Sequence, residues 1–588
     1  MDDLFSAYSV KAPVDLVQSS ENGMGAGGNG KRKLMEVNEI GGGLTSSGSG
    51  SKRVMSSPVV FDAQGNAVTP ADISPALQRY HARADAGKIV YTYNGDLSPV
   101  VEYYPDLSVE LYPQAVLTPY RHMDNSIKLR QEALQARFRY YSQLLQKSGV
   151  IVTDREGEGG GKEQGGGGGY LLEELRLKSN PSWTIVHVSK QQIQNDGDES
   201  LWMVMDANGE MLPLMFHPNN GGGGPQSLSL SLLHGTIVAL KGLIVRSGGR
   251  GEALLVSDCC RGHLPPRVTS RAKQLLTLQK PKPLGVLMAA GPFALWEPSP
   301  VDSTDSSGTS PHAHAHHLDF APLRALKRRL HDAEDNRPSA VVLLGPFVPE
   351  AAAEVIPSTR LVKMIEQELR GFIPAQNGEG GDTGKSMALM LIPSSSDTWH
   401  DAVVPQPPYE KLSRQHHHTS AAGSTATAED QDPAVPSASC MPNPVMLSLH
   451  DVTMGLSTVD VLKHAEEISI APTEDRITRL CSHLLQQRSF YPIWPPAPGS
   501  LVNPNKRKEL SLTKSPHIMV LRSELQHFVK VTHDCVFLNP GRLCRGTSGG
   551  TYAYLTLHPL SASSLEGLDD AKVDHAIQDR LRVDIIRI

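Results

Sequence analysis

The chain has 588 residues, is 39% hydrophobic and carries a formal net charge of -6. Its length predicts about two to four domains, with ample chain for a buried core. The acidic balance argues against a dedicated high-affinity DNA clamp, which needs a basic face, but leaves room for a local basic patch.

Residues 1–100 are predicted to be a disordered linker with basic runs. Glycine-rich stretches such as GMGAGGNGKRK and GGGLTSSGSGSKR offer little apolar surface to offset the entropy lost on ordering. Basic runs beside Ser/Thr-Pro sites are typical of a nuclear import signal with phosphorylation nearby, and equally of an ordinary solvated linker. The possible phosphorylation sites are Ser57, Thr69 and, far downstream, Ser515.

Residues 101–178 are predicted to hold a helical segment and a Gly-rich break. Between Met123 and Ser148, apolar residues recur at helical spacing with Arg and Gln between them, which indicates an amphipathic helix. A glycine run that ends at Gly169 then separates this helix from the next region.

Residues 180–266 show a β pattern. WTIVHV, LWMVMD, MLPLMF, GTIVALKGLIV and ALLVSD are apolar runs of strand length. The sequence from Asp206 to Gly209 predicts a hairpin turn, and Gly242 could bend a curled strand. Five such strands fit a small Greek-key barrel of the oligonucleotide-binding (OB) type, with a generic β-sandwich as the alternative.

Residues 283–588 alternate apolar strands with helices, which is typical of sheets covered on both faces. Helices are expected over 318–335, 359–371 and about 477–487. Two low-complexity insertions, at 300–317 and 412–438, interrupt the pattern and contain histidine tracts. These tracts lack supporting carboxylates, so we interpret them as accidental rather than metal-binding.

The strand ends of this region invite a test for two-metal phosphoesterase chemistry, which needs carboxylates and imidazoles in the order D-x-H, G-D-x-x-D, G-N-H-D/E and G-H-x-H. The chain has no D-x-H. Gly345-Pro346-Phe347 has proline where the bridging aspartate belongs, and Ser394-Ser395-Ser396-Asp397 has serines in place of Asn and His. The stretch 523–528 replaces the late histidine pair. Because proline and serine cannot supply these ligands, we expect no catalysis, metal or cofactor.

Three other motifs have competing interpretations. Gly384-Lys385-Ser386 resembles the end of a phosphate-binding loop, but an apolar strand follows where a helix must begin. Trp183, Trp202 and Phe216 could stack bases, yet they lie in apolar runs and are predicted to belong to the core. Four basic residues could form a modest basic edge or a solvated rim: Lys241, Arg246, Arg250 and Arg261.

The six cysteines form no C-x-x-C pair, which predicts reduced thiols rather than a zinc ribbon or a disulfide framework. The opening MDDLFSAYSV has no signal-peptide pattern, and no window approaches the ~20 apolar residues of a membrane span. We therefore expect a soluble intracellular protein.

Several longer motifs resemble the B-subunit family of replicative DNA polymerases, most closely its polymerase alpha branch. These motifs are AGKIVYTYN, GPF, LGPF, PQPPY, GLSTVD, AEEIS, QRSFYP, CVFLNPGRL and GTSGGTY. They are spread from about residue 85 to the C-terminus. The family-signature residues are Pro405, Gln406, Pro407, Pro408, Asn539, Pro540, Gly541, Arg542, Gly549, Gly550, Thr551 and Tyr552.

This resemblance implies an α+β multidomain protein with an OB-type barrel and an inactive calcineurin-like phosphoesterase domain, a β-sandwich flanked by helices. It implies a nuclear, non-catalytic scaffold that binds the C-terminal region of the polymerase alpha catalytic subunit and, through the complex, primase. Contact with DNA would be weak or indirect, with none to membranes. The alternatives are an active metal-dependent phosphoesterase and a single-strand DNA-binding protein.

Members of this family also carry a small N-terminal helical domain on a flexible linker. The chain opens at linker-like sequence, so we expect that domain either to be missing or to lie outside a shortened sequence. Recruitment of other factors through it is therefore in doubt.

Overall fold

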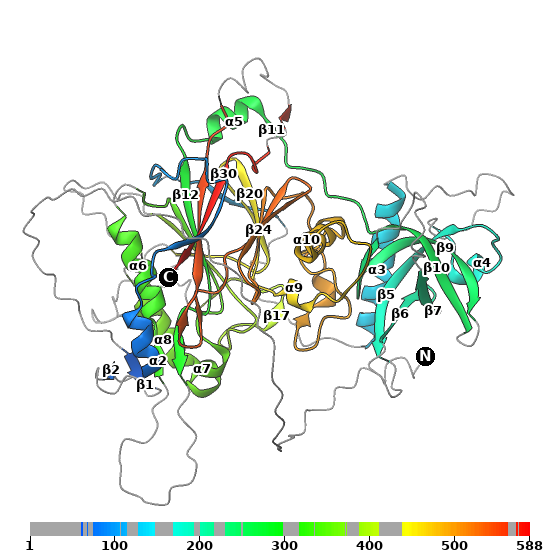
Figure 1. Ribbon diagram of the computed structural model, residues 1–588, viewed down its shortest axis with the longest axis horizontal. Helices are drawn as coiled ribbons and strands as arrows, with labels where there is room; N and C mark the ends of the chain where they lie inside the picture. The colour runs from blue at the N-terminus through cyan, green and yellow to red at the C-terminus, as the bar shows by residue number, and fades with distance from the viewer. Residues whose placement is uncertain are drawn as a thin grey trace, which may run out of the picture. The chain divides into compact units, whose positions relative to one another are not determined.

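The computed structural model describes residues 60–62, 67–68, 75–105, 107–113, 127–147, 169–192, 200–216, 230–247, 251–297, 317–333, 336–370, 372, 387–410, 438–561, 572–573 and 576–588 (Figure 1). All of them belong to one compact unit, residues 57–588. Several predicted features lie outside the described residues: Ser57, Thr69, Arg250, the two histidine tracts except His317, and Gly384-Lys385-Ser386.

A seven-stranded mixed sheet is formed by six strands from residues 284–587 and one strand from residues 89–93, near the start of the described chain. Its strands in spatial order are β18 (Ala438–Cys440), β16 (Ala388–Ile392), β15 (Ala340–Leu344), β12 (Leu284–Ala290), β28 (Thr551–Leu557), β30 (Leu581–Arg587) and β3 (Ile89–Tyr93). The first four are parallel and the rest antiparallel. The parallel strands β12 and β15 are buried along their whole length, as their continuous apolar sequence predicts.

A six-stranded sheet packs against the first. Its strands in order are β24 (Phe528–Thr532), β25 (Cys535–Asn539), β23 (Ile518–Leu521), β20 (Val452–Ser457), β19 (Val445–Leu449) and β4 (Val109–Leu111). Here β20, β23 and β25 are parallel. Apolar side chains from both sheets form one buried core, so the two sheets make a sandwich.

Helices cover the outer face of each sheet (Figure 1). Alternate residues of β12 show the layering: Val286 and Met288 enter the core between the sheets, whereas Leu287 and Ala289 enter the core beneath the helices. The helices on the seven-stranded sheet are α6 (Ala321–Asp332), α7 (Glu350–Val355) and α8 (Ser358–Leu369). Those on the six-stranded sheet are α9 (Val461–His464) and α10 (Arg476–Gln486).

Residues 182–260 form a closed five-stranded barrel. Its order is β10 (Gly251–Cys260), β7 (Met211–Phe216), β6 (Ser200–Met205), β5 (Ser182–Gln192) and β9 (Ile237–Ser247). All five predicted strands are confirmed. So is the predicted turn, where the Asp206 carboxylate accepts hydrogen bonds from the backbone N–H groups of Asn208 and Glu210. Gly242 lies in β9 where a Cβ would approach the Leu255 carbonyl oxygen to 2.6 Å.

The amphipathic helix predicted before the barrel is α3 (Ile127–Lys147), whose apolar face packs against β5 and β9. The remaining helices of the described residues are α2 (Pro75–Ala82), α4 (Leu172–Leu175), α5 (Ala272–Leu278) and the 3-10 helix η2 (Pro504–Lys506). The minor strands are β1 (Val60–Asp62), β2 (Ala67–Val68), β8 (Leu230–Leu233), β11 (Ser270–Arg271), β13 (Leu295–Glu297), β14 (His317–Asp319), β17 (Val403–Val404), β21 (Glu467–Ile470), β22 (Leu501–Val502), β26 (Cys544–Arg545), β27 (Ser548–Gly549) and β29 (Lys572–Val573).

The linker predicted over residues 1–100 is wrong in the part that the structure describes, because β1 pairs with β14 and residues 75–100 contain α2 and β3. Strand β3 pairs with β30 and forms one edge of the seven-stranded sheet. Similarly, β4 falls in the segment predicted to hold only a helix and a break, yet it pairs with β19. As edge strands they are partly exposed, with Ile89 at 48% and Tyr91 at 40%, so their sequences lack a continuous apolar run.

All six cysteines are free thiols, three of them buried. Burial raises the pKa of the Cys440 thiol to about 12, which keeps it protonated and unreactive. Within the described residues, no helix is long and apolar enough to cross a membrane.

Candidate functional site

The residues predicted to mark a degenerate phosphoesterase site lie together at the carboxyl ends of the parallel strands of the seven-stranded sheet. Gly345, Pro346 and Phe347 follow β15, and Ser394 to Asp397 follow β16. The carboxyl edge of parallel strands is where sheets of this kind place their ligands. The structure thus brings the predicted positions to one edge. The strand ends of the six-stranded sheet adjoin it, since the Thr458 hydroxyl after β20 donates to the Pro393 carbonyl after β16, and we call the two sets of strand ends together the carboxyl edge.

Asp397 carries the one carboxylate among these positions, and its oxygens are already occupied. It accepts hydrogen bonds from the backbone N–H of Phe347 at 2.9 Å, the backbone N–H of Ser394 at 3.0 Å and the hydroxyl of Tyr409 at 2.5 Å. Burial raises the pKa of Asp397 above its usual value, although these hydrogen bonds oppose the shift. The side chain therefore ties the two loops together rather than facing an open site.

Aromatic side chains fill the space beside Asp397. The ring of Phe347 lies 5.1 Å from that of Phe293 and 5.9 Å from that of Tyr409, and Trp399 stacks on Tyr409 at 4.5 Å. Phe293, Phe347 and Tyr409 are fully buried. At Gly345, a Cβ would approach the Asp397 carboxylate to 2.6 Å. This part of the edge is a packed core.

The ends of the six-stranded sheet contribute a second polar group. Asp460, after β20, accepts hydrogen bonds from the Ser523 hydroxyl at 2.7 Å and the Glu524 N–H at 2.8 Å. Glu524 in turn pairs with Lys463 at 2.6 Å and Arg542 at 3.4 Å. These carboxylates bind protein donors, so they are not arranged as a set of metal ligands.

No group of three or more His, Cys, Asp and Glu side chains within the described residues could hold a metal ion. At the carboxyl edge, the side chains at the positions of the missing ligands are proline, phenylalanine and serine. Neither proline nor phenylalanine offers a donor atom, and the Ser394 hydroxyl faces the backbone N–H of Ser396 at 3.3 Å. The residues present do not fit a two-metal centre.

Two groups of family-signature residues close the connections around this edge. Gln406 and Asn443 pair through both backbone and side chains, with the Asn443 amide donating to the Gln406 side-chain oxygen at 2.7 Å. Asn539 ends β25 and accepts a hydrogen bond from the Gly541 N–H at 3.1 Å. The Thr551 hydroxyl donates to the Pro540 carbonyl at 2.8 Å. These residues have structural roles.

The remaining signature positions lie nearby. Gly550 has no room for a side chain because a Cβ would collide with the carbonyl of Arg542, and Tyr552 is buried beneath the helices. The other members of the set are Pro405, which follows β17, Pro407, whose carbonyl accepts a hydrogen bond from His400 at 2.7 Å, Pro408, and Gly549, where an added Cβ would lie 3.1 Å from the Tyr80 ring.

The motif QRSFYP begins the 487–495 loop, which follows α10 and contacts the barrel. The Trp494 N–H donates to the carbonyl of Gly235 at 2.9 Å, and His187 of β5 bonds to the Trp494 carbonyl at 2.6 Å. The Gln487 amide donates to the Ile237 carbonyl at 3.0 Å. Backbone carbonyls and N–H groups of the loop thus replace solvent at one end of the barrel.

Helix α3 reinforces this contact. Its Tyr141 hydroxyl donates to the Gln487 carbonyl at 2.5 Å, and its Arg137 guanidinium donates to the carbonyl of Pro492. Phe138 and Leu145 on the same face are buried against β5 and β9. Removing this helix would therefore expose both the barrel wall and the loop.

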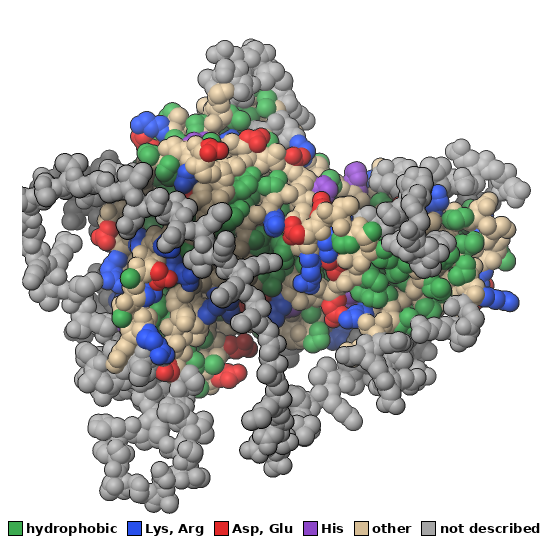
Figure 2. Space-filling view, viewed as in Figure 1, with side chains coloured by type: hydrophobic (Ala, Val, Ile, Leu, Met, Phe, Trp, Pro, Cys, Tyr) green, Lys and Arg blue, Asp and Glu red, His purple; other side chains and the backbone are tan. Residues whose placement is uncertain are grey.

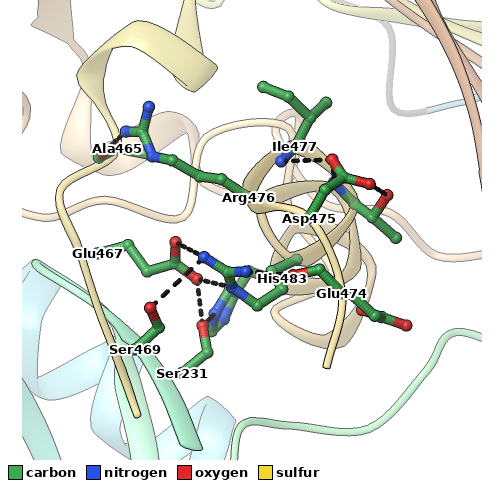
Figure 3. A network of polar contacts seen from close by, with 11 residues as sticks. Ser231, Ala465, Glu467, Ser469, Glu474, Asp475, Arg476, Ile477 and His483 are labelled. Carbon is green, nitrogen blue, oxygen red and sulfur yellow. Dashed lines mark hydrogen bonds and ion pairs between the residues drawn. The ribbon is translucent and has the colours of Figure 1, made fainter. Parts of the chain in front are cut away.

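A buried polar network also joins β8, β21 and α10 (Figure 3). The Ser231 hydroxyl lies 2.5 Å from the Glu467 carboxylate and 2.7 Å from His483 Nε2. Arg479 makes a two-pronged pair with Glu467 at 2.8 and 2.9 Å. Ser231 and His483 are both buried. Although Ser, His and Glu meet here, the hydroxyl cannot reach a substrate, so the network serves to hold β8 against β21.

Acidification should weaken the contact between the barrel and the loop. Burial lowers the pKa of His187 to about 4, helped by the nearby charges of Arg137 and His234. An unfolded histidine titrates near 6.5, so stability present above pH 6.5 is lost as the pH falls toward 4. Between pH 7 and pH 5, protonation of this one residue in the unfolded state should lower the free energy of unfolding by about 2 kcal/mol.

Urea unfolding at the two pH values checks this prediction. His187→Gln keeps a hydrogen-bond donor for the Trp494 carbonyl but does not titrate. Between pH 7 and pH 5 it should therefore lose less unfolding free energy than the wild type. His263→Gln, on an exposed histidine, is the matched control. An equal loss in the wild type and His187→Gln would contradict the assignment.

The three aromatic residues considered for base stacking pack against the protein core, as predicted, instead of forming an exposed surface. Trp202 and Phe216 lie against the barrel core, and Trp183 lies against α3. The Arg246 side chain is 91% exposed and faces Glu252 at 4.0 Å, while Lys241 and Arg261 are half-buried. The described residues therefore do not present an aromatic stacking platform in a basic groove.

The outer wall of the barrel is instead apolar. Val204, Leu214 and Leu254 point into the barrel core, so their neighbours along each strand point outward. Leu255 lies beside Leu243 on β9 and Met215 on β7, and Met203 lies opposite Pro213. These side chains are partly buried and partly exposed, and Figure 2 shows hydrophobic side chains gathered over the barrel. This face was not predicted from the sequence. It could have been predicted, because both the inward-facing and the outward-facing residues of the barrel strands are apolar.

Sequence reasoning also missed Asp460, Arg522 and Arg542 as side chains of the carboxyl edge. Asp460 and Arg542 appeared in the resemblance motifs without a role. The available signal was position, because Arg522 directly follows the buried strand β23, as Pro346 and Asp397 follow β15 and β16.

Comparison with known proteins identifies relatives of this chain. Residues 310–530 match the B-subunit family of DNA polymerases alpha and epsilon. The DNA polymerase alpha B-subunit of Rattus norvegicus is 34% identical over 230 residues, covering 38% of this chain and 34% of the relative. The protein of the same name is 27% identical over 336 residues in Drosophila melanogaster (56% and 45%) and 31% over 314 residues in Bos taurus (51% and 42%).

Each alignment spans less than half of the relative's length. The matched region nevertheless includes the strand ends Gly345–Phe347 and Ser394–Asp397 and the motif QRSFYP. The chain is thus similar over residues 310–530 to the B-subunit family of DNA polymerases alpha and epsilon, and the relatives that it matches are DNA polymerase alpha B-subunits.

Proposed function

We propose that the chain is a non-catalytic accessory subunit of the nuclear DNA polymerase alpha–primase complex. In this proposal it binds the C-terminal region of the catalytic subunit and supports primer synthesis during the initiation of replication. The relatives' shared name and the family match support this role. The barrel would be an OB-type domain at 180–266, and the sandwich an inactive phosphoesterase-like domain over 283–588 completed by β3 and β4.

The observation that carries the proposal is the filled carboxyl edge. A phosphoesterase must place carboxylates and imidazoles around two metals in an open site. Here Phe347 and Tyr409 occupy that space, and the Asp397 carboxylate accepts hydrogen bonds from two backbone N–H groups and the Tyr409 hydroxyl. This supports a protein retained for its surfaces rather than for hydrolysis. An active phosphoesterase is therefore disfavoured.

The apolar barrel wall supports a protein partner rather than nucleic acid. Contiguous exposed apolar side chains on a soluble protein mark surfaces that bind other proteins. Single-stranded DNA would instead need exposed aromatic rings and a run of cations. We place the partner's contact on the wall around Leu243, Leu255 and Met215, so direct DNA contact in this proposal is weak or indirect.

Co-expression with the C-terminal region of a polymerase alpha catalytic subunit tests both statements. The wild-type chain should be recovered with that region through an affinity tag on either partner. Leu255→Glu should reduce recovery at least tenfold because it places a carboxylate in an apolar contact.

Leu276→Glu, on α5 at a residue that is 52% exposed, is the matched control and should be recovered like the wild type. Thermal unfolding of both variants shows whether the barrel is intact. Full recovery of a folded Leu255→Glu variant would move the contact elsewhere, and no recovery of the wild-type chain would reject the accessory role.

A further inference from the structure

Arg522 is a buried cation whose side chain has no hydrogen-bond partner in the described part of the chain. It directly follows β23, and only 8% of its surface is exposed. Its Nε is sealed from solvent without an acceptor. Burial lowers the pKa of its guanidinium, which shows the cost of keeping this charge out of water.

The acidic groups nearest to Arg522 are committed to other donors. Its charge interacts with those of Asp460, Glu524, Asp397 and Arg542, which come from the ends of different strands. Asp460 bonds to a hydroxyl and a backbone N–H, and Asp397 accepts three hydrogen bonds. Glu524 pairs with Lys463 and Arg542. These carboxylates offset the charge of Arg522 at a distance but do not bond to it.

Arg542 adds a second guanidinium with a spare donor. Its Nε is also buried without an acceptor, and its one side-chain contact among the described residues is the 3.4 Å pair with Glu524. Lys463 and Arg545 lie at the same edge, where Arg545 donates to the Glu524 carbonyl at 3.2 Å. Cations therefore outnumber the carboxylates Asp397, Asp460 and Glu524 among the side chains named here.

We propose that Arg522 and Arg542 bind one phosphate-sized oxyanion at the carboxyl edge. A guanidinium is a rigid fork of N–H donors whose geometry matches phosphate oxygens, and two of them around one anion relieve their mutual repulsion. The anion would accept hydrogen bonds from the terminal N–H groups of the two side chains, which, unlike the two Nε atoms, are not sealed from solvent. This site is independent of the accessory role, because it concerns a small ion rather than a protein partner.

Thermal unfolding of the full chain in inorganic phosphate, against chloride at equal ionic strength, tests the proposal. Phosphate should raise the unfolding midpoint by several degrees and saturate, since an ion that binds only the folded state stabilises it. Arg522→Met should abolish this shift. The same variant should unfold at a higher temperature than the wild type in chloride, because it removes a buried charge without a partner.

Arg545→Met, on an exposed arginine of the same edge, is the matched control and should keep the phosphate response. A second titration with a thymidine dinucleotide identifies the source of the oxyanion. Free phosphate acting at lower concentration assigns the site to a small ion, and the dinucleotide acting at lower concentration assigns it to a nucleic acid backbone. The absence of any shift beyond that of chloride, or an equal shift in folded Arg522→Met, would overturn the proposal.

Discussion

Asp397→Ala should lower the free energy of unfolding by about 4 kcal/mol. The substitution leaves the buried N–H groups of Phe347 and Ser394 without an acceptor and frees the Tyr409 hydroxyl. Each unsatisfied buried donor costs about 1–3 kcal/mol, partly offset here because a buried carboxylate is removed as well. Urea unfolding monitored by fluorescence measures the difference.

Ser395→Ala is the matched control for this substitution, since Ser395 lies on the same loop but is exposed. It should change the free energy of unfolding by less than about 0.5 kcal/mol. If Asp397→Ala were as stable as this control, the carboxylate would have no structural role, and an unfilled catalytic position would again be a reasonable interpretation.

Gly235→Ala should weaken the contact between the barrel and the 487–495 loop, again by about 4 kcal/mol. Gly235 has a φ of +79°, and an added Cβ would lie 2.6 Å from the Trp494 backbone nitrogen. The cost has two parts: a strained left-handed backbone and displacement of the loop. Loss of the contact should also make the loop more susceptible to limited proteolysis.

Gly209→Ala separates these two parts. Gly209 has a similar φ of +88° in the hairpin of the same barrel, but nothing lies within 4 Å of its added Cβ. This control should cost only the backbone strain, about 1 kcal/mol, and leave proteolysis of the loop unchanged. If both variants lost the same unfolding free energy, the loop would not contact Gly235 in solution.

The strands and helices were predictable where the sequence carries a strong period or a continuous apolar run. β12, β15 and the barrel strands follow from such runs, and α3, α6, α8 and α10 follow from helical spacing. The edge strands β3 and β4 were not predictable from the sequence. Each has one exposed face, and each lies far in sequence from its partner, β30 or β19, so no local pattern indicates the pairing.

The site was predictable as a set of missing ligands but not as a packed structure. The motifs located Pro346 and Asp397, whereas the packing of Tyr409 and Trp399 over them depends on tertiary contacts. Sequence also could not show that the 487–495 loop contacts the barrel, since its bonds to Gly235 and His187 are made by the backbone groups of Trp494. Two signals went unused: a charged residue directly after a buried strand, as at Arg522, and the apolar character of both faces of the barrel strands.

Sedimentation velocity of the purified chain, mixed with the purified C-terminal region of a polymerase alpha catalytic subunit, tests the accessory role most directly. We expect both proteins to sediment together as a single one-to-one species at micromolar concentration. Two separate species, with the chain folded and monomeric, would contradict the accessory role, and the similarity to polymerase alpha B-subunits would then no longer indicate this partner.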